Sequence, residues 1–352
     1  MKIVHCLFTF KTGGAQVLSV DLLNEMCVQH EVSLIIVNNQ WNDKLLKQID
    51  KRVAVFYIGR KEGSKNPIPI IRLNLLLLKL KPDIIHCHEP KMACIIKTKN
   101  SKLLQTIHDV GIPTDYYDLY NVSVAISDAV YADVIPKYNA HRVKKVYNGI
   151  SFELFRQRNQ FKIKNGEPLR LVQLSRLVYE KKGQDVLLNA LHKILNDYNI
   201  ADFTLDFIGG GESQAFLEKM VLDLGLQKNV NFIGERSRDW LFENLSSYHL
   251  LVQPSRYEGF GLTILEGFAA GLPVLASNID GPAEIISHAP GGFLFENGDI
   301  ENCAKSLVRI FDLYNNNEIE ALMNKTILPI RNTYSIKCCT RRYLNVYDLL
   351  ME

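Results

Sequence analysis

Short apolar runs alternate with helical patterns along most of this chain, and that alternation limits its possible folds more than any other feature. Each run has the length of one buried strand and is followed by a turn signal. Buried strands separated by helices form βαβ units, so the pattern predicts parallel sheets with crossover helices. The runs in the first half are KIVHCLF (2–8), EVSLIIV (31–37), VAVFYI (53–58), DIIHC (83–87), KLLQTIH (102–108) and VSVAIS (122–127).

A second series of the same kind follows a polar, turn-rich segment, FRQRNQFKIKNGEP (155–168), which we predict to be a linker. The chain is therefore expected to form two doubly wound α/β domains in tandem, with ligands at the carboxyl ends of the strands. A helical pattern at 335–350 closes the chain. The runs of the second series are LRLVQLS (169–175), FTLDFIG (203–209), NVNFIG (229–234), HLLVQPS (249–255) and LPVLAS (272–277).

Composition excludes several protein classes. With 352 residues, 47% apolar and 22% charged, the chain suits two globular domains rather than a disordered or fibrous protein. Its seven cysteines include no CxxC pair, which favours a reducing compartment without disulfides or structural zinc. The start, MKIVHCLFTF, lacks the features of a signal peptide, and the leucine-rich run at 73–82 is shorter than the roughly 20 residues of a membrane span. We therefore expect a cytoplasmic protein.

Charge is distributed unevenly. Residues 1–150 hold 20 Lys and Arg against 13 Asp and Glu, whereas the remainder is net acidic. A basic half suggests contact with something anionic, such as a phosphate-bearing acceptor or a membrane surface, although a solvated lysine-rich surface would give the same count. The segment at 66–81 is either an interfacial helix or, as we favour, an ordinary domain helix.

Glycines and basic residues recur where strands end. Gly13 and Gly14 in FKTGGAQ let the backbone approach an anionic ligand before a helix, or form a plain tight turn, but they do not make GxGxxG. Arg176, Lys181 and Lys182 in SRLVYEKKGQD suit a diphosphate, unless they are only exposed loop residues. The turn FIGGGES, which contains Gly210, repeats the pattern.

The stretch EGFGLTILE places a carboxylate on each side of a predicted helix start. Amides near Gly261, Leu262 and Thr263 would be free to bind phosphate, and Glu266 could accept hydrogen bonds from ribose hydroxyls. Glu258, on the approach loop, would face whatever lies beyond the phosphates. The competing interpretation is a capping box, with Glu266 bonding back to the Thr263 amide.

These motifs together resemble the family 4 retaining glycosyltransferases, which have the GT-B fold. The resemblance implies two Rossmann-like domains facing a central cleft: an acceptor-binding domain at 1–157, joined by the C-terminal helix at about 335–352, and a nucleotide-sugar-binding domain at 168–334. The motifs concerned are FKTGGAQ, DIIHCHEP, LLQTIHD, VAISDAV, VYNGIS, SRL…KKGQD, FIGGGE, VNFIG, PSRYEGFGLTILEGFAAGLPVLAS and GGFLFENGD.

The resemblance also implies roles for the second-half residues. Arg176 and Lys182 would hold the donor diphosphate, with Lys181 as the alternative because this loop is one residue longer than the commoner EKG form. Glu258 would contact the donor sugar, and Glu266 the ribose. The amides of Gly261, Leu262 and Thr263 match contacts to sugar and phosphate.

In the first half, Gly14, beside Gly13, matches a glycine whose amide meets the diphosphate, and His108 matches a histidine against the transferred sugar. Family members need neither metal nor cofactor, and the leaving phosphate helps to deprotonate the acceptor. We expect a nucleotide-sugar donor, most simply a UDP- or GDP-hexose, a glycan or lipid-linked acceptor, peripheral contact with the inner face of an anionic membrane, and no nucleic acid. HCH (86–88) is expected to lie along a strand end rather than to bind zinc.

Three other functions would each leave a different signature in the sequence. A nicotinamide dehydrogenase would need GxGxxG after an opening strand, and neither domain supplies it. A glycosidase would need Glu258 and Glu266 across one sugar bond, which a loop and a helix interior do not favour. A non-catalytic nucleotide-sugar-binding subunit would bind donor without turnover and would lack first-half motifs such as the Gly-Gly loop and His108.

Overall fold

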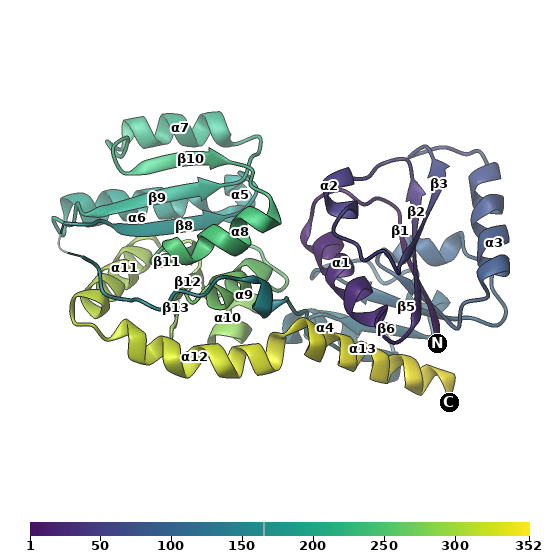
Figure 1. Ribbon diagram of the computed structural model, residues 1–352. Coiled ribbons are helices and arrows are strands. Elements are labelled where there is room, and N and C mark those ends of the chain that lie inside the picture. Colours follow the sequence, from purple (N-terminus) through teal and green to yellow (C-terminus); the bar gives the residue numbers. More distant parts are fainter. Residues whose placement is uncertain (165) are drawn as a thin grey trace. The chain divides into compact units, whose positions relative to one another are not determined.

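A computed structural model describes residues 1–164 and 166–352 of the chain (Figure 1). The chain forms two compact units: residues 1–150 with 336–352, and residues 151–335. Each unit contains one sheet in which every pair of neighbouring strands is parallel, with helices as the connections. The predicted pair of doubly wound α/β folds is confirmed.

The first unit has a seven-stranded sheet in the order β3-β2-β1-β4-β5-β6-β7. The order reverses direction beside β1, because the chain builds outward first on one side and then on the other. All six strands predicted from the first half are present, and β7 is an edge strand that the apolar pattern did not mark. The bounds are β1 Lys2–Leu7, β2 Glu31–Asn38, β3 Ala54–Arg60, β4 Ile84–Cys87, β5 Lys102–Ile107, β6 Val122–Ala125, β7 Val143–Lys145, α1 Gly14–Met26, α2 Asp43–Leu46, α3 Ile68–Leu80 and α4 Asp128–Val134.

Both faces of this sheet are buried. Alternate side chains of β1 point to opposite faces, so Ile3 packs in one apolar cluster and Val4 in another. The cluster around Ile3 includes Leu22 and Met26 of α1, and the cluster around Val4 includes Leu73 of α3. Burial on both faces explains why these strands read as continuous apolar runs rather than as alternating ones.

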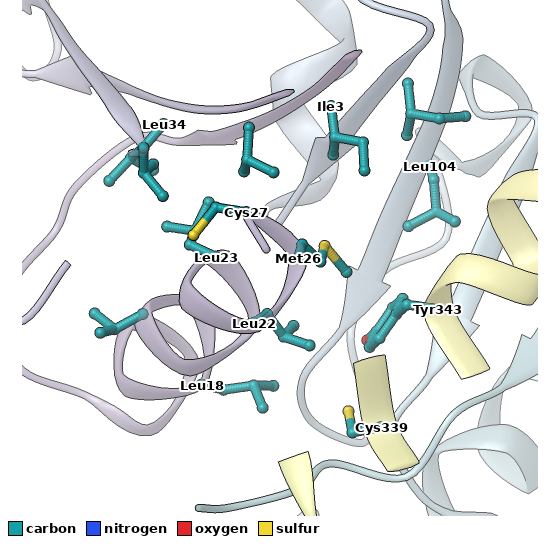
Figure 2. Packing of buried hydrophobic residues seen from close by; sticks show 14 of the residues in the cluster. Ile3, Leu18, Leu22, Leu23, Met26, Cys27, Leu34, Leu104, Cys339 and Tyr343 are labelled. Atoms are coloured by element: carbon teal, nitrogen blue, oxygen red, sulfur yellow. The ribbon is translucent and has the colours of Figure 1, made fainter. Parts of the chain in front are cut away.

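The C-terminal helix α13 (Ile336–Met351) completes the core of the first unit, as predicted. Cys339 and Tyr343 of α13 lie in the same buried cluster as Leu22 of α1 (Figure 2). Tyr343 and Tyr347 have no exposed surface, so the helix packs with its aromatic face inward. A segment at the end of the sequence therefore supplies part of the core of the domain at the beginning.

The second unit has a six-stranded sheet in the order β10-β9-β8-β11-β12-β13. All five strands predicted from the second half are present, and β13 is a further edge strand. The bounds are β8 Leu169–Leu174, β9 Phe203–Ile208, β10 Val230–Gly234, β11 Leu250–Gln253, β12 Val274–Ser277, β13 Gly292–Phe295, α5 Tyr179–Lys182, α6 Gln184–Asn196, α7 Gln214–Asp223, α8 Arg238–Asn244, α9 Leu262–Ala269, α10 Asp280–Ile286, α11 Ile300–Asn315 and α12 Ile319–Tyr334.

The segment predicted as a linker, 155–168, is bonded to the second unit. The Arg156 amide donates to the Phe242 carbonyl and the Arg158 amide to the Ala270 carbonyl, each at 2.8 Å, and Phe161 is buried. The residues that make these bonds are therefore part of the second unit rather than a free tether. The change from one unit to the other lies before this segment, between Ile150 and Ser151.

None of the helices in the described residues combines the length and the hydropathy that crossing a bilayer requires.

Candidate functional site

Two loops of the second unit meet at the carboxyl edge of its sheet. Strands β8 and β11 are neighbours, with Leu171 paired to Leu250, so the segments that follow them leave the sheet side by side. Gly183, at φ +66°, lies so close to the second loop that a Cβ there would be 1.8 Å from the Pro254 carbonyl oxygen. Only glycine permits both this backbone conformation and this approach.

The approach of the two loops brings Lys182 and Glu258 together. The Lys182 Nζ lies 2.5 Å from Glu258 Oε2, and the two side chains are 14% and 20% exposed. Lys181 is placed differently: its carbonyl accepts a hydrogen bond from the Arg256 amide at 2.9 Å. The Lys182 ammonium group thus meets the loop that carries Glu258, and the backbone of Lys181 is bonded to the same loop.

Arg176 is exposed at the end of β8, and its backbone is held by buried polar side chains. Gln184 Nε2 donates to the Arg176 carbonyl and to Ser175 Oγ, both at 3.0 Å. Gln173 Nε2 donates to the Lys182 carbonyl at 3.0 Å. Both glutamines are fully buried, so the backbone carrying Arg176 and Lys182 is fixed from below while the arginine side chain stays accessible.

The helix after Glu258 begins in a way that rules out the competing interpretation, a capping box. Gly261, at φ +104°, is the N-cap residue of α9 and Thr263 is already the second helical residue, so Thr263 cannot act as the cap. The first amides of a helix have no intrahelical acceptor, and here they belong to Leu262 and Thr263, which are half-buried. Glu266 is half-buried one turn further into α9.

The glycine-rich turn after β9 supports the loop after β8. The Gly210 carbonyl accepts from the Leu177 amide at 3.0 Å, and a Cβ on Gly211 would lie 2.4 Å from the Leu177 carbonyl oxygen. A Cβ on Gly209 would lie 1.9 Å from the Ser175 carbonyl oxygen. Gly209 and Gly211 are therefore required by backbone packing beneath Arg176, which is a sufficient reason for these two glycines apart from any ligand.

In the first unit, the Gly-Gly loop leads directly into a helix. Gly13 is the extended N-cap residue of α1, and Gly14 is its exposed first residue. A Cβ on Gly13 would meet the flexible end of Gln16 at 2.7 Å, so the crowding comes from a side chain that can move. The loop exposes the amino end of α1 at the carboxyl edge of the sheet, where an anion is favoured.

His108 follows β5 at the same edge and belongs to a cluster of four histidines. His88 Nδ1 is 3.2 Å from His108 Nε2, and His88 Nε2 is 3.1 Å from His5 Nδ1. His86 bonds to Tyr347 and Thr106 hydroxyls, both at 2.7 Å. The predicted position of HCH (86–88) along a strand end is observed, with His86 in β4 and His88 just beyond it.

Burial holds these rings neutral. Desolvation lowers the pKa of His5 to about 3 and that of His108 to about 4, and it places the pKa of His86 and His88 well below the ordinary value. Beside them, burial raises the pKa of the Glu89 carboxyl to about 8, opposed by hydrogen bonds from the Phe8 amide.

Comparison with known protein families decides the class of the protein. Residues 155–324 match the family described as "Glycosyl transferases group 1", and residues 12–154 match "Glycosyltransferase Family 4". The chain is a family 4 glycosyltransferase. The predicted resemblance and the prediction of an enzyme are both confirmed, and the GT-B fold is shared with solved glycosyltransferases.

Relatives of this glycosyltransferase differ widely in sequence. An uncharacterized glycosyltransferase of Methanocaldococcus jannaschii is 27% identical over 305 residues, which cover 77% of this chain and 76% of that protein. A glycosyltransferase structure from Rickettsia africae matches with a TM-score of 0.83 at 22% identity, covering 100% and 98% of the chains. Anabaena HepE, solved in complex with UDP-glucose, matches with a TM-score of 0.80 at 21% identity and 99% coverage of both.

This glycosyltransferase has a second ion pair between the same two segments, which the sequence did not predict. Arg256 binds Asp185 through two bonds of 2.8 and 2.7 Å and also donates to the Tyr179 carbonyl at 2.8 Å. Both charged residues stand inside motifs already quoted, SRYEG and KKGQD, but nothing in their spacing showed that they would meet. The pair ties α6 to the loop that carries Glu258.

Proposed function

We propose that this glycosyltransferase moves a hexose from a uridine or guanosine diphosphate hexose to a glycan or lipid-linked acceptor, with retention at the anomeric carbon. The observation that carries the proposal is the arrangement at one sheet edge of the second unit. There Lys182 lies 2.5 Å from Glu258, beside the exposed Arg176 and ahead of the α9 amides. Cationic groups, helix amides and a carboxylate are the groups that a diphosphate and a sugar require.

The chemistry proposed for this edge is electrostatic. When the nucleoside diphosphate leaves, negative charge grows on its outer phosphate, so positive groups held in place lower the barrier. Lys182, Arg176 and the amides of Leu262 and Thr263 supply that charge in the role that a metal ion has in other transferases. The departing phosphate oxygen then accepts the proton of the attacking hydroxyl on the same face of the sugar.

The remaining predicted contacts are part of the proposal. Glu258 accepts hydrogen bonds from the donor sugar, and its pairing with Lys182 in the absence of donor keeps both side chains in place. Glu266 accepts from the ribose. By resemblance, His108 contacts the transferred sugar, and the amides of Gly13 and Gly14 contact the diphosphate.

The donor-site test uses Lys182→Met and Glu258→Gln. Each is expected to lower kcat/KM by about a hundredfold or more, the size associated with losing one preorganised contact to the transition state. The control is Lys219→Met on the exposed surface of α7, which should transfer at the wild-type rate. A panel of UDP-, GDP- and ADP-sugars in thermal-shift and hydrolysis assays identifies the donor, because the bound sugar raises the apparent stability. Full activity in either site variant would refute the assignment.

We also propose that α3 contacts an anionic membrane. One face of this helix is buried through Leu73 and Leu77, while four large aliphatic side chains stand on its exposed surface among exposed Arg72 and Lys79. Apolar side chains between cationic ones suit an anionic lipid interface, where a lipid-linked acceptor would also lie. The four exposed side chains are Ile68 at 53%, Ile71 at 54%, Leu75 at 60% and Leu78 at 65%.

Membrane contact is tested by flotation with vesicles containing anionic or only zwitterionic lipid. Wild-type protein is expected to bind the anionic vesicles and to be released partly by salt, since screening removes the electrostatic share. The double variant Leu75→Gln, Leu78→Gln should lose binding, whereas Leu119→Gln, a matched exposed leucine of the same unit, should keep it. Binding that persists in the double variant or ignores lipid charge would contradict the proposal.

A further inference from the structure

Three histidines behind His108 take no part in the proposed donor contacts. His5 and His86 have no exposed surface, and His88 is 5% exposed. His5 in β1 is the cross-strand partner of His86 in β4, and His88 follows two residues later. The sheet therefore gathers imidazoles in a buried position directly behind the one histidine assigned to the sugar.

Three of the rings form an in-plane hydrogen-bonded chain. His5 Nδ1 lies 3.1 Å from His88 Nε2, and His88 Nδ1 lies 3.2 Å from His108 Nε2. The ring centroids are 5.3 and 5.4 Å apart, with interplanar angles of 30° and 16°. Each centroid separation exceeds the N···N distance by about two ring radii, so the rings meet edge to edge, as in-plane N–H donors and lone pairs require.

His5, at the far end of this row of three histidines, sets the direction in which their hydrogen bonds are donated. A neutral imidazole has one N–H donor and one acceptor nitrogen, so each of these rings donates at one nitrogen and accepts at the other. His5 Nε2 is buried and has no hydrogen-bond partner among the residues that the structure describes. A proton there would be a buried unsatisfied donor, which proteins rarely tolerate.

The proton of His5 therefore lies on Nδ1 and is donated to His88 Nε2. His88 must then carry its own proton on Nδ1 and donate it to His108 Nε2. We propose that His5 and His88 are positioning residues that fix His108 as the Nδ1–H tautomer, with Nε2 as an acceptor within the chain. Only the statement of what His108 does to the sugar rests on the proposed function.

This tautomer restricts the chemistry of His108. Its other ring nitrogen, Nδ1, is then an N–H donor, so through it His108 can hydrogen-bond a substrate oxygen but cannot accept the acceptor's proton there. The neutral state that the argument needs is supported by the burial of all the rings, which lowers the pKa of each below its ordinary value. Proton removal is left to the departing phosphate.

A metal site in the same cluster is less consistent with the geometry. Ligand atoms of His5, His86 and His88 lie within 4.8 Å of one another. However, the His86 and His88 rings stack face to face at 4.5 Å and 17°, so their in-plane lone pairs do not converge on one point. Both nitrogens of His86 are already bonded to the hydroxyls of Tyr347 and Thr106.

The test is histidine side-chain ¹⁵N NMR of the donor-free, full-length protein, with signals assigned by single substitutions. His108 is expected to show a protonated Nδ1 and an unprotonated Nε2, and the exposed-turn control His141→Gln should leave these signals in place. The opposite tautomer, or a freely exchanging mixture, would overturn the inference whatever the enzyme's activity. If the tautomer is as stated but no sugar donor is turned over, the proposed function fails, whereas the hydrogen-bonded chain of histidines stands.

Two variants of His5 separate positioning from mere packing. His5→Asn keeps an N–H donor near the position of Nδ1 and should preserve the tautomer and the rate. His5→Phe fills the space without a donor; it should release the Nε2–H form of His108 and lower kcat about tenfold, the size of one hydrogen bond. Unchanged His108 signals in His5→Phe would refute the role of His5. Stoichiometric zinc that copurifies with the protein and is lost in His86→Ala would refute the hydrogen-bonded chain of histidines.

Discussion

Gly183→Ala offers the sharpest test of how the donor edge is built. At φ +66° an L-residue carries a strain of roughly 1–2 kcal/mol, and its Cβ would lie 1.8 Å from the Pro254 carbonyl oxygen, roughly 1.5 Å short of an ordinary contact. Relief requires the backbone of one loop to move, which typically costs about 1–3 kcal/mol more. The expected total is about 2–5 kcal/mol.

Gly225→Ala is the matched control within the same unit. Its φ is +71°, close to that of Gly183, but nothing lies within 4 Å of the Cβ that it would gain. It should therefore show the backbone strain alone, about 1–2 kcal/mol, which corresponds to a Tm loss of about 2–4 °C per kcal/mol in a unit of this size.

Activity separates the two variants further. Gly183 directly follows Lys182 and touches the loop of Glu258, so a shift of about 1 Å there should reduce kcat roughly a hundredfold. Gly225→Ala should retain the wild-type kcat at temperatures where it is folded. Thermal unfolding and donor hydrolysis are measured on both variants. Equal Tm losses, or full activity in Gly183→Ala, would show that the close approach does not position the two side chains.

Two further predictions concern stability and pH. The pKa values of His5, His86 and His88 are lower in the folded protein than the unfolded value of 6.5, so the unfolded chain binds more protons. The free energy of unfolding is therefore highest above about pH 6.5. Below that pH it falls by up to about 1.4 kcal/mol per pH unit for each histidine. Urea denaturation between pH 7.5 and 5 checks this, and a flat profile would contradict it. Glu89 acts in the opposite window, since its folded pKa of about 8 lies above the ordinary value of 4.5. Its contribution to stability is present at pH 4.5 and is lost as pH rises through 8. Glu89→Gln should therefore raise the Tm at pH 8.5 and leave it nearly unchanged at pH 5, and a uniform change at both pH values would count against the buried carboxyl.

The sequence alone determined the class of fold, because a strand buried on both faces must be apolar along its whole length. KIVHCLF and LRLVQLS could be placed from that rule without any contact being known, and parallel strands with helical connections put Arg176 and Glu258 at one sheet edge. Short edge strands escaped the rule: β7, VKK, has one buried residue of three. The capping box remained an alternative at the sequence level because a local motif cannot show that Gly261 takes the left-handed cap position and Thr263 the interior.

Tertiary structure alone decided which side chains meet. The pairing of Lys182 with Glu258 depends on the register of β8 against β11 and on the Gly183 contact, and neither is encoded within the loop itself. The histidine chain joins His5 of β1 to His88, just after β4, and His108, just after β5, across more than a hundred positions. The sequence therefore assigned a role to His108 alone and did not show that the other two would meet it. A local sequence shows which polar and charged side chains a segment offers. The direction of their hydrogen bonds and their burial arise only when distant segments pack together.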